Sequence, residues 1–263
     1  MASVIAFANQ KGGVAKTTTV HTLGDALADM GRSVLLVDLD PQACLTYASG
    51  VNGENLEATL HDVFVGRTPA RSVLIESHDG PDLLPSSIDL AGAEVHLMTR
   101  TGREFVLARA LKPLHDNYDY MLIDCGPSLG ILTINALTAA DWVVIPFQCD
   151  TLSHRGVGQL LETIGDVRAY TNDSLGVLGG VATMYDGRTR LARQVLETVA
   201  SQHELKVFDP PIPKSVRAAE APAYGKSVLR HARSSKPAVA YRSLAKAIDG
   251  AVRAGKRRSS ERH

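Results

Sequence analysis

The chain has 263 residues, of which 44% are apolar and 21% charged, with 28 basic and 28 acidic side chains. This length and apolar content suffice to bury one large core, and no linker-like stretch divides the chain. We therefore expect one domain over residues 1–254, followed by a basic, disordered tail at 255–263. No apolar run approaches the ~20 residues that span a membrane, and no signal sequence opens the chain, so a cytoplasmic protein is expected.

The first apolar run, at 3–8, predicts a strand and leads into Lys11-Gly12-Gly13-Val14-Ala15-Lys16-Thr17-Thr18, ahead of a helix predicted at 17–30. Glycines in such a loop let backbone N–H groups close on phosphate oxygens at the positive end of the helix dipole. A lysine then contacts the β- and γ-phosphates and a hydroxyl binds Mg²⁺, roles that fall to Lys16 and Thr17. Ala15 stands where the usual pattern has glycine, and its methyl group is tolerated if φ is negative.

Two further strands end in aspartates. The strand at 33–38 runs into Asp38-Leu39-Asp40-Pro41-Gln42, and the strand at 119–124 ends at Asp124. Two carboxylates at the end of a buried strand beside a phosphate loop are costly unless they face a cation or water. Asp124 is expected to hold Mg²⁺ through a water molecule.

The remaining strands are predicted near 81–85, 142–147, 176–183 and 205–208, with amphipathic helices between them. This alternation predicts an α/β fold with a mostly parallel, twisted sheet and helices on both faces. The nucleotide is expected at the carboxyl ends of the strands.

The loop K-G-G-V-A-K-T-T at 11–18 resembles the deviant Walker A motif of the ParA, MinD and nitrogenase-reductase group of P-loop NTPases. The segment D-L-D-P-Q at 38–42 resembles the ParA (Soj-type) branch. Segments at 84–91, 183–189 and 212–217 also resemble that branch, so the resemblance covers roughly residues 4–248. The chain departs from the family pattern at Gly126, where proline is usual, and at 149–155.

The resemblance implies roles for individual residues. Lys11 would reach across a dimer interface to the partner's nucleotide, and Asp40 would position the attacking water. Asp38 would sit in the outer shell of the metal. Pro213 and Ser215 would contact the adenine, although asparagine is more usual at the second position.

The resemblance also implies the function: a slow, partner-stimulated ATPase that uses ATP and Mg²⁺ and is a homodimer when ATP-bound. Such a dimer binds double-stranded DNA without sequence preference on the nucleoid, and segregates a chromosome or plasmid with a ParB-like partner. Because the chain opens at its first strand, we expect no helix-turn-helix domain ahead of it, and hence no operator-specific repression.

Charge is unevenly placed along the chain. Residues 214–263 hold thirteen Lys or Arg against three Asp or Glu, a net charge of +10, which leaves −10 for residues 1–213. Such asymmetry is typical of proteins with a polyanionic partner. The expected DNA contacts are Lys214, Arg217, Lys226, Arg230 and Arg233, with an affinity that falls steeply with salt.

Three alternatives stay open. A MinD-like membrane-cycling ATPase would use the helix at 239–254, but its apolar face (Tyr241, Leu244, Ile248, Val252) is small and lacks Phe and Trp, so a helix docked on the core is preferred. A ParA-like ATPase could position a protein cargo. An iron–sulfur electron donor would need bridging cysteines; Cys44, Cys125 and Cys149 are interpreted instead as small buried side chains.

Overall fold

The computed structural model describes residues 1–150 and 153–260, and side chains as far as residue 256. Six strands form one sheet in the order β3-β2-β4-β1-β5-β6, and every pairing between neighbours is parallel. The strands are β1 (Ser3–Phe7), β2 (Val34–Leu39), β3 (Asp82–Leu84), β4 (Tyr120–Cys125), β5 (Trp142–Gln148) and β6 (Gly176–Thr183). The expected parallel α/β fold is confirmed.

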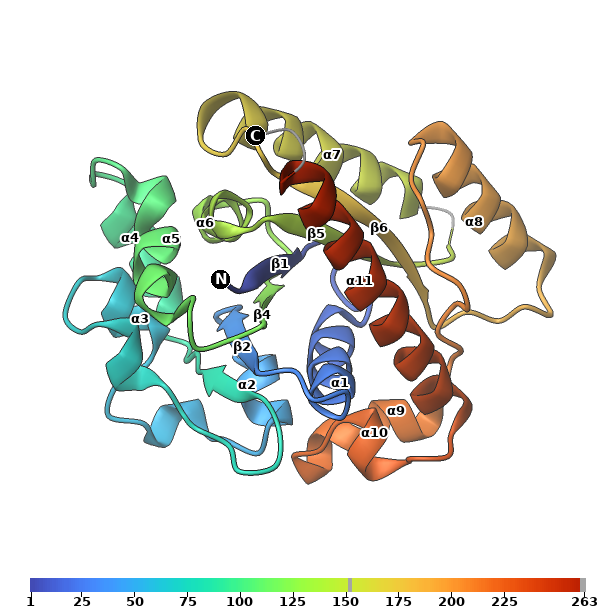
Figure 1. Cartoon of the computed structure of the whole chain (residues 1–263), viewed down its shortest axis with the longest axis horizontal. Helices are drawn as coiled ribbons and strands as arrows, with labels where there is room; N and C mark the ends of the chain where they lie inside the picture. The colour runs from blue at the N-terminus through green and yellow to red at the C-terminus, as the bar shows by residue number, and fades with distance from the viewer. Residues whose placement is uncertain (151–152, 261–263) are drawn as a thin grey trace.

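Helices cover both faces of this sheet (Figure 1). One face carries α1 (Lys16–Ala28), α10 (Val228–His231) and α11 (Lys236–Ser260), and the other carries α3 to α7. These are α3 (Leu60–Phe64), α4 (Leu90–Leu97), α5 (Val106–Leu111), α6 (Ile131–Ala139) and α7 (Ser153–Tyr170). The remaining helices are α2 (Cys44–Ala48), α8 (Arg190–Gln202) and α9 (Val216–Glu220), with short 3₁₀ turns η1 (Gly53–Asn55), η2 (Ala70–Val73), η3 (Arg103–Phe105), η4 (Lys112–Leu114) and η5 (Ala221–Tyr224).

The alternation of side chains along β1 explains the two layers. Val4 and Ala6 pack into the core beneath α3–α7, whereas Ile5 and Phe7 pack into the core beneath α1 and α11. Because successive residues of a strand point to opposite faces, a strand buried on both sides must be apolar throughout. All five residues of β1 are buried.

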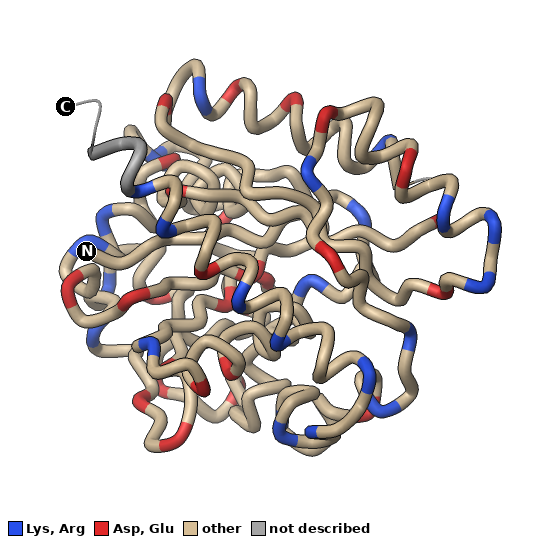
Figure 2. Tube along the Cα trace, turned by 45° about the vertical axis from the view of Figure 1, so that its right-hand side comes forward, with Lys and Arg blue, Asp and Glu red and all other residues tan. Residues whose placement is uncertain are grey.

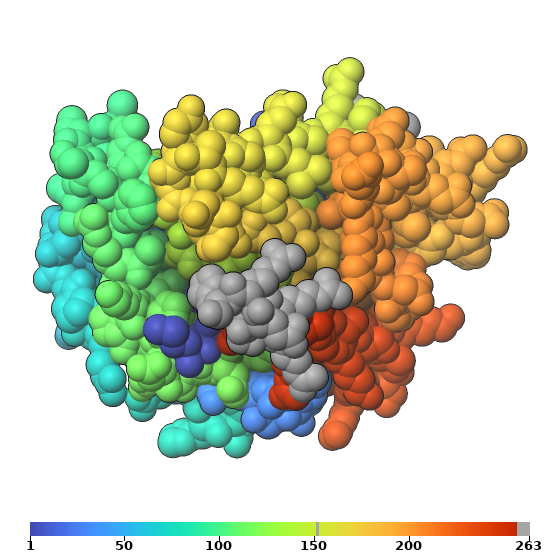
Figure 3. Space-filling view, turned by 45° about the horizontal axis from the view of Figure 1, so that its top comes forward, coloured from blue at the N-terminus to red at the C-terminus, as the bar shows by residue number. Residues whose placement is uncertain are grey.

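The last helix is longer than expected. The prediction began it at 239 and placed a disordered tail at 255–263, but α11 runs from Lys236 to Ser260. Residues 261–263 lie outside the described part of the chain. The Lys256 ammonium donates a hydrogen bond to the Met1 carbonyl at 3.1 Å, and Figure 3 shows the start of the chain in blue beside the red end of α11. The helix thus continues past Val252, the last buried residue of its apolar face.

The strand predicted at 205–208 does not form. Residue 207 makes a single parallel bridge to Gly180, supported by hydrogen bonds on either side of it. Pro210 and Pro211 follow directly, and because proline has no backbone N–H, the ladder cannot continue.

Among the described helices, none is long and apolar enough to cross a membrane.

Candidate nucleotide-binding site

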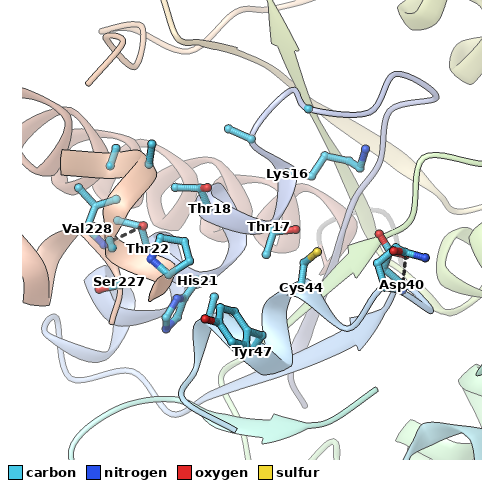
Figure 4. Close-up of a pocket in the computed structure, with 18 of the residues that line it drawn as sticks. Lys16, Thr17, Thr18, His21, Thr22, Asp40, Cys44, Tyr47, Ser227 and Val228 are labelled. Atoms are coloured by element: carbon cyan, nitrogen blue, oxygen red, sulfur yellow. Dashed lines mark hydrogen bonds between the residues drawn. The ribbon is translucent and has the colours of Figure 1, made fainter. Parts of the chain in front are cut away.

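A cavity of about 960 Å³ opens beside the first turns of α1. Figure 4 shows Lys16, Thr17, Thr18 and His21 along α1, facing Asp40 and the side chains of α2. Of the ten predicted nucleotide contacts, eight line this cavity: Gly12, Gly13, Ala15, Lys16, Thr17, Thr18, Pro213 and Ser215. The structure thus brings together two segments about 200 residues apart in the sequence. Lys11 and Val14 are not among the lining residues.

The loop is held closed by its own lysine. The Lys16 ammonium donates hydrogen bonds to the carbonyls of Asn9 at 3.1 Å and Lys11 at 3.0 Å. Val14 is buried, and its carbonyl accepts a hydrogen bond of 2.9 Å from the Thr183 hydroxyl at the end of β6. Burial lowers the pKa of Lys16, although Asp124 and other nearby groups act in the opposite direction. A phosphate group in the cavity would restore the favourable environment of the cation.

Ala15 does not meet the condition under which its methyl group is tolerated, which is a negative φ. Its φ is 59° and its ψ is 35°, in the left-handed region. A Cβ atom in this region costs roughly 1–2 kcal/mol relative to glycine or to right-handed backbone. The loop therefore keeps the conformation that glycine would adopt and carries the strain of the methyl group.

Lys11 lies on the outer side of the loop. Its backbone N–H donates to the Asn9 amide oxygen at 3.0 Å, and its ammonium forms an ion pair with the Asp150 carboxylate. Both side chains of the pair are about one-third exposed, 32% and 31%. The two lysines of the loop therefore occupy different environments: Lys16 is buried in the loop, and Lys11 is partly exposed and paired with Asp150.

Asp124 at the end of β4 is fully buried, and neither carboxylate oxygen accepts a hydrogen bond of good geometry, although the Thr17 hydroxyl is close by. Burial raises its pKa well above 3.8, and the neighbouring Asp38 carboxylate raises it further. An unpartnered buried carboxylate is strongly disfavoured unless a cation or water approaches it. The Thr17 hydroxyl and the Lys16 ammonium lie near enough to lower the same pKa.

Asp38 is buried too, but its carboxylate is engaged. One oxygen accepts hydrogen bonds from the backbone N–H and the hydroxyl of Thr46, both at 2.7 Å, and the other accepts one from the Asp40 N–H at 3.3 Å. Burial raises its pKa to about 6. Its contacts fix the start of α2 relative to β2, and its assignment to the metal's outer shell stays a prediction.

Asp40 is half-buried and lines the cavity. Its carboxylate accepts a hydrogen bond of 3.0 Å from the Gln42 N–H, and its carbonyl accepts one of 2.8 Å from the Ser86 hydroxyl. A Cβ atom added at Gly126 would lie 3.4 Å from the Asp40 carboxylate carbon, an ordinary contact. A larger side chain would therefore fit at position 126, so lack of space does not explain why glycine replaces the usual proline there.

These groups suit Mg²⁺ bound together with phosphates. Among the described residues, no cluster of three or more His, Cys, Asp or Glu forms a metal cage. Mg²⁺ is usually held by one or two protein oxygens with water and substrate phosphates, which matches the Thr17 hydroxyl and the unpartnered Asp124. When bound, Mg²⁺ would neutralise phosphate charge.

The sequence reasoning missed several residues that shape the site. His21 and Thr22 on α1 line the cavity, as does Thr183 at the end of β6. Their signal was available, because His21 and Thr22 follow Thr17 and Thr18 by four positions each and so share their helix face, and Thr183 ends a parallel strand. Asp150 was not singled out, since its segment departs from the family pattern.

The predicted DNA contacts separate into three groups. Lys214 and Lys226 line the mouth of the nucleotide cavity, and Arg217 on α9 and Arg233 after α10 are exposed. Arg230 instead pairs with Asp29 at 3.0 Å and with Asp25 at 3.4 Å, and is thereby tied to α1. Figure 2 shows Lys and Arg recurring along the lower-right edge of the trace.

The cysteines are not uniformly buried. Cys125 is buried, as expected, whereas Cys44 is exposed and Cys149 is intermediate. Cys44 is the first residue of α2 and lines the nucleotide cavity. It therefore belongs to the candidate site and not to the core.

The apolar face of α11 is docked on the protein. Tyr241, Leu244, Ile248 and Val252 are each at most 1% exposed and belong to the core beneath α1. The Tyr241 hydroxyl lies 3.1 Å from that of Thr19 on α1. The expected docking of this helix on the core is confirmed.

Known proteins share this arrangement. A family model described as an AAA domain matches residues 2–177. The chain is 43% identical to the sporulation initiation inhibitor protein Soj of Bacillus subtilis, over 94% of this chain and 98% of that protein. It is 42% identical to the chromosome partitioning protein ParA of Caulobacter vibrioides, over 93% of each.

A solved structure described as cobyrinic acid a,c-diamide synthase from Mycobacterium smegmatis, with bound ADP and magnesium, is 48% identical and superposes with a TM-score of 0.87 over 97% of both chains. The same protein was also solved with an ATP analogue and magnesium. ATP and Mg²⁺ as cofactors are therefore supported, in accord with the geometry of the loop. The chain belongs to the AAA-domain family of P-loop NTPases that includes the Soj and ParA partitioning ATPases.

Proposed function

We propose that this chain is an ATPase that dimerises on binding ATP, coats double-stranded DNA without sequence preference, and moves a chromosome or plasmid with a ParB-like partner. The observation that carries the proposal is the difference in environment between the two lysines of the loop. Lys16 is buried among carbonyls, whereas Lys11 is at the surface beside the cavity. A lysine in that position can reach a nucleotide bound by a second copy.

In this proposal each residue acts on charge or on water. Lys16 stabilises negative charge on the β- and γ-phosphates, and the partner's Lys11 adds a second cation when the dimer closes. Asp40 lines the cavity and orients the attacking water. Basal turnover is slow, because the constellation is complete only in the dimer.

The basic surface supports DNA binding by charge. Arg217 and Arg233 are exposed, and Lys214 and Lys226 lie at the mouth of the nucleotide cavity, so nucleotide and DNA surfaces adjoin. A dimer presents each cation twice, and each phosphate neutralised adds to the salt dependence of binding. The protein would act in the cytoplasm, on the nucleoid.

The test is binding to non-specific duplex DNA with ATP, ADP or no nucleotide, at two salt concentrations. We expect binding with ATP that weakens steeply with salt, and that is lost in Lys16→Ala and in Arg217→Glu. Equal binding in all nucleotide states, or none in any, would refute the proposal.

A second candidate comes from the Mycobacterium smegmatis structures, whose description names an amide-forming synthase. That activity would use the same Mg²⁺–ATP site. Incubation with cobyrinic acid, ATP and glutamine or ammonia, followed by mass spectrometry, distinguishes it: diamide formation would favour this reaction over partitioning.

A further inference from the structure

His21 is a buried polar side chain in the wall of the nucleotide cavity. It lies on the second turn of α1 and is 8% exposed. Figure 4 shows its ring between the side chains of Tyr47 and Ser227, which line the same cavity. Within the described part of the chain, its ring has no hydrogen-bond partner. A buried polar ring without a partner is costly, so a ligand with hydrogen-bonding groups is favoured there.

The other buried polar side chains of this wall, which joins the second turn of α1 to the start of α10, are already engaged. The Thr22 hydroxyl accepts a hydrogen bond of 3.4 Å from the first N–H of α10. The Ser227 hydroxyl donates one to the Asp25 carboxylate and accepts one of 3.3 Å from the Arg230 N–H. His21 is therefore the side chain that has both ring nitrogens left for a ligand.

The imidazole of His21 is neutral at pH 7. Burial lowers its pKa below 6.5, although Asp25, one turn further along α1, acts in the opposite direction. The Asp25 carboxylate is itself paired with the Arg230 guanidinium at 3.4 Å. A neutral imidazole offers one N–H donor and one nitrogen acceptor. This combination suits a hydroxyl group, which both donates and accepts, better than a phosphate, which only accepts.

The place of His21 along α1 matches the sugar of a nucleotide. His21 follows Thr17 by four residues, which is one helical turn and about 6 Å along the axis. The phosphates and Mg²⁺ belong at Lys16 and Thr17, at the start of the helix. The predicted base contacts, Pro213 and Ser215, lie on a different segment that lines the same cavity. Because the sugar joins the phosphates to the base, it falls between these two sets of contacts.

We propose that His21 determines specificity for the sugar: its imidazole forms a hydrogen bond with a ribose hydroxyl and thereby favours ribonucleotides over deoxynucleotides. A deoxy sugar leaves the buried ring unpaired, and a site built to bond a hydroxyl rejects an analogue that lacks it. The contact rests on the proposed use of ATP in this cavity, and needs neither DNA nor a ParB-like partner.

The test compares the binding of ADP, 2′-deoxyADP and 3′-deoxyADP, each with Mg²⁺, by isothermal titration calorimetry on the full chain. Diphosphates are used because the dimer is expected with ATP and not with ADP. The variants are His21→Ala and His21→Leu, of which the second keeps much of the volume of the ring without its hydrogen bonds. The matched control is His96→Ala, which changes an exposed histidine on α4.

We expect the wild type and His96→Ala to bind ADP about three- to tenfold more tightly than at least one of the deoxynucleotides. In both His21 variants this ratio should fall to about one, because ADP loses its hydrogen bond and the deoxynucleotide has none to lose. The ratio is taken within one protein, so a smaller folded fraction does not change it. A wild type that binds all three nucleotides equally, or a His21 variant that keeps the wild-type ratio, would overturn the proposal.

GDP, measured on the same samples, separates the sugar from the base. A His21→Ala protein that loses the preference for ADP over GDP, and keeps the preference for ribose, would place His21 at the base and overturn the sugar contact.

ATP-dependent binding to duplex DNA reports on the proposed function separately. DNA binding in a wild type that shows no ribose preference refutes the His21 contact alone. No DNA binding in a wild type whose ribose preference depends on His21 refutes the partitioning function and leaves the contact standing.

Discussion

The Lys11 ammonium and the Asp150 carboxylate, 139 residues apart in the sequence, form an ion pair at the outer side of the phosphate loop. Lys11 must leave this pair to reach the nucleotide of a second copy. The pair is part-exposed, so its contribution is modest, on the order of 1 kcal/mol or less. If Lys11 acts across the dimer as proposed, Asp150 competes with dimerisation.

Replacing Asp150 by Asn should make dimerisation easier. We expect the ATP concentration for half-maximal dimer formation to fall about two- to fivefold, as measured by sedimentation velocity, because the competing carboxylate is removed. Glu162→Gln, which neutralises an exposed acid on α7, is the control and should have no effect. A weaker dimer in Asp150→Asn would show that Asp150 supports the contact.

Replacing Ala15 by Gly should stabilise the protein. Ala15 has a φ of 59°, and removal of its methyl group relieves left-handed strain, offset in part by the greater freedom of glycine in the unfolded chain. We expect a gain of about 0.5–1 kcal/mol in the free energy of unfolding in urea. Ala26→Gly, inside α1, should have the opposite sign, and a loss of stability in both variants would contradict the strain at Ala15.

Asp124 should couple stability to Mg²⁺ and to pH. Its raised pKa means that, without metal, its contribution to stability is fully present below the usual value of 3.8 and is lost as the pH rises toward the folded pKa. We therefore expect Asp124→Asn to be more stable than the wild type at pH 7 in EDTA, by about 1–3 kcal/mol.

The same variant should lose the extra thermal stability that ATP with Mg²⁺ gives the wild type, relative to ATP with EDTA. Differential scanning fluorimetry measures both effects. An Asp124→Asn protein that is less stable in EDTA, yet keeps the Mg²⁺ effect, would place the cation elsewhere.

Several features of the site could be predicted from the sequence, because each is local. A strand, glycines, Lys16 and Thr17 in order specify a phosphate loop, and eight of the ten predicted nucleotide contacts line one cavity. The left-handed φ of Ala15 is the conformation that the usual glycine would adopt at this position, and the alanine in its place conceals that signal. The pairing of Lys11 with Asp150 depends on β1 and β5 being neighbours, and that of Arg230 with Asp29 depends on the packing of α10 against α1.

The length of α11 and the loss of the strand at 205–208 both depend on contacts between residues far apart in the sequence. Helical periodicity predicted the apolar face of α11, but the contact between Lys256 and Met1 joins the two ends of the chain and has no local signal. The residues at 205–208 have strand-like composition, yet they meet the sheet through a single bridge before two prolines.

The C-terminal helix α11 should stabilise the fold by packing on the core, and should not anchor the protein to a membrane. Ile248 is fully buried against the core beneath α1, so Ile248→Ala should lower the free energy of unfolding by about 3 kcal/mol. Val239→Ala, at a position that is 55% exposed, is the control and should change stability by less than about 0.5 kcal/mol. Co-sedimentation of the wild type with anionic vesicles in ATP would contradict the docked helix.

The two arginines of the basic segment should differ in their effects. Arg217 is exposed on α9, so Arg217→Ala should weaken ATP-dependent DNA binding and leave stability unchanged. Arg230 pairs with Asp25 and Asp29, so Arg230→Ala should cost about 1 kcal/mol in stability. The reverse pattern, in DNA binding and urea unfolding, would assign Arg217 to the fold and Arg230 to DNA.

The most direct test of the account is the molar mass of Lys11→Ala in ATP and Mg²⁺, by light scattering after gel filtration, beside the wild type and Lys16→Ala. We predict that Lys11→Ala binds ATP with wild-type affinity in equilibrium dialysis but stays monomeric, whereas the wild type doubles its mass with ATP and not with ADP. A Lys11→Ala protein that dimerises with ATP as the wild type does would contradict the role of the second lysine.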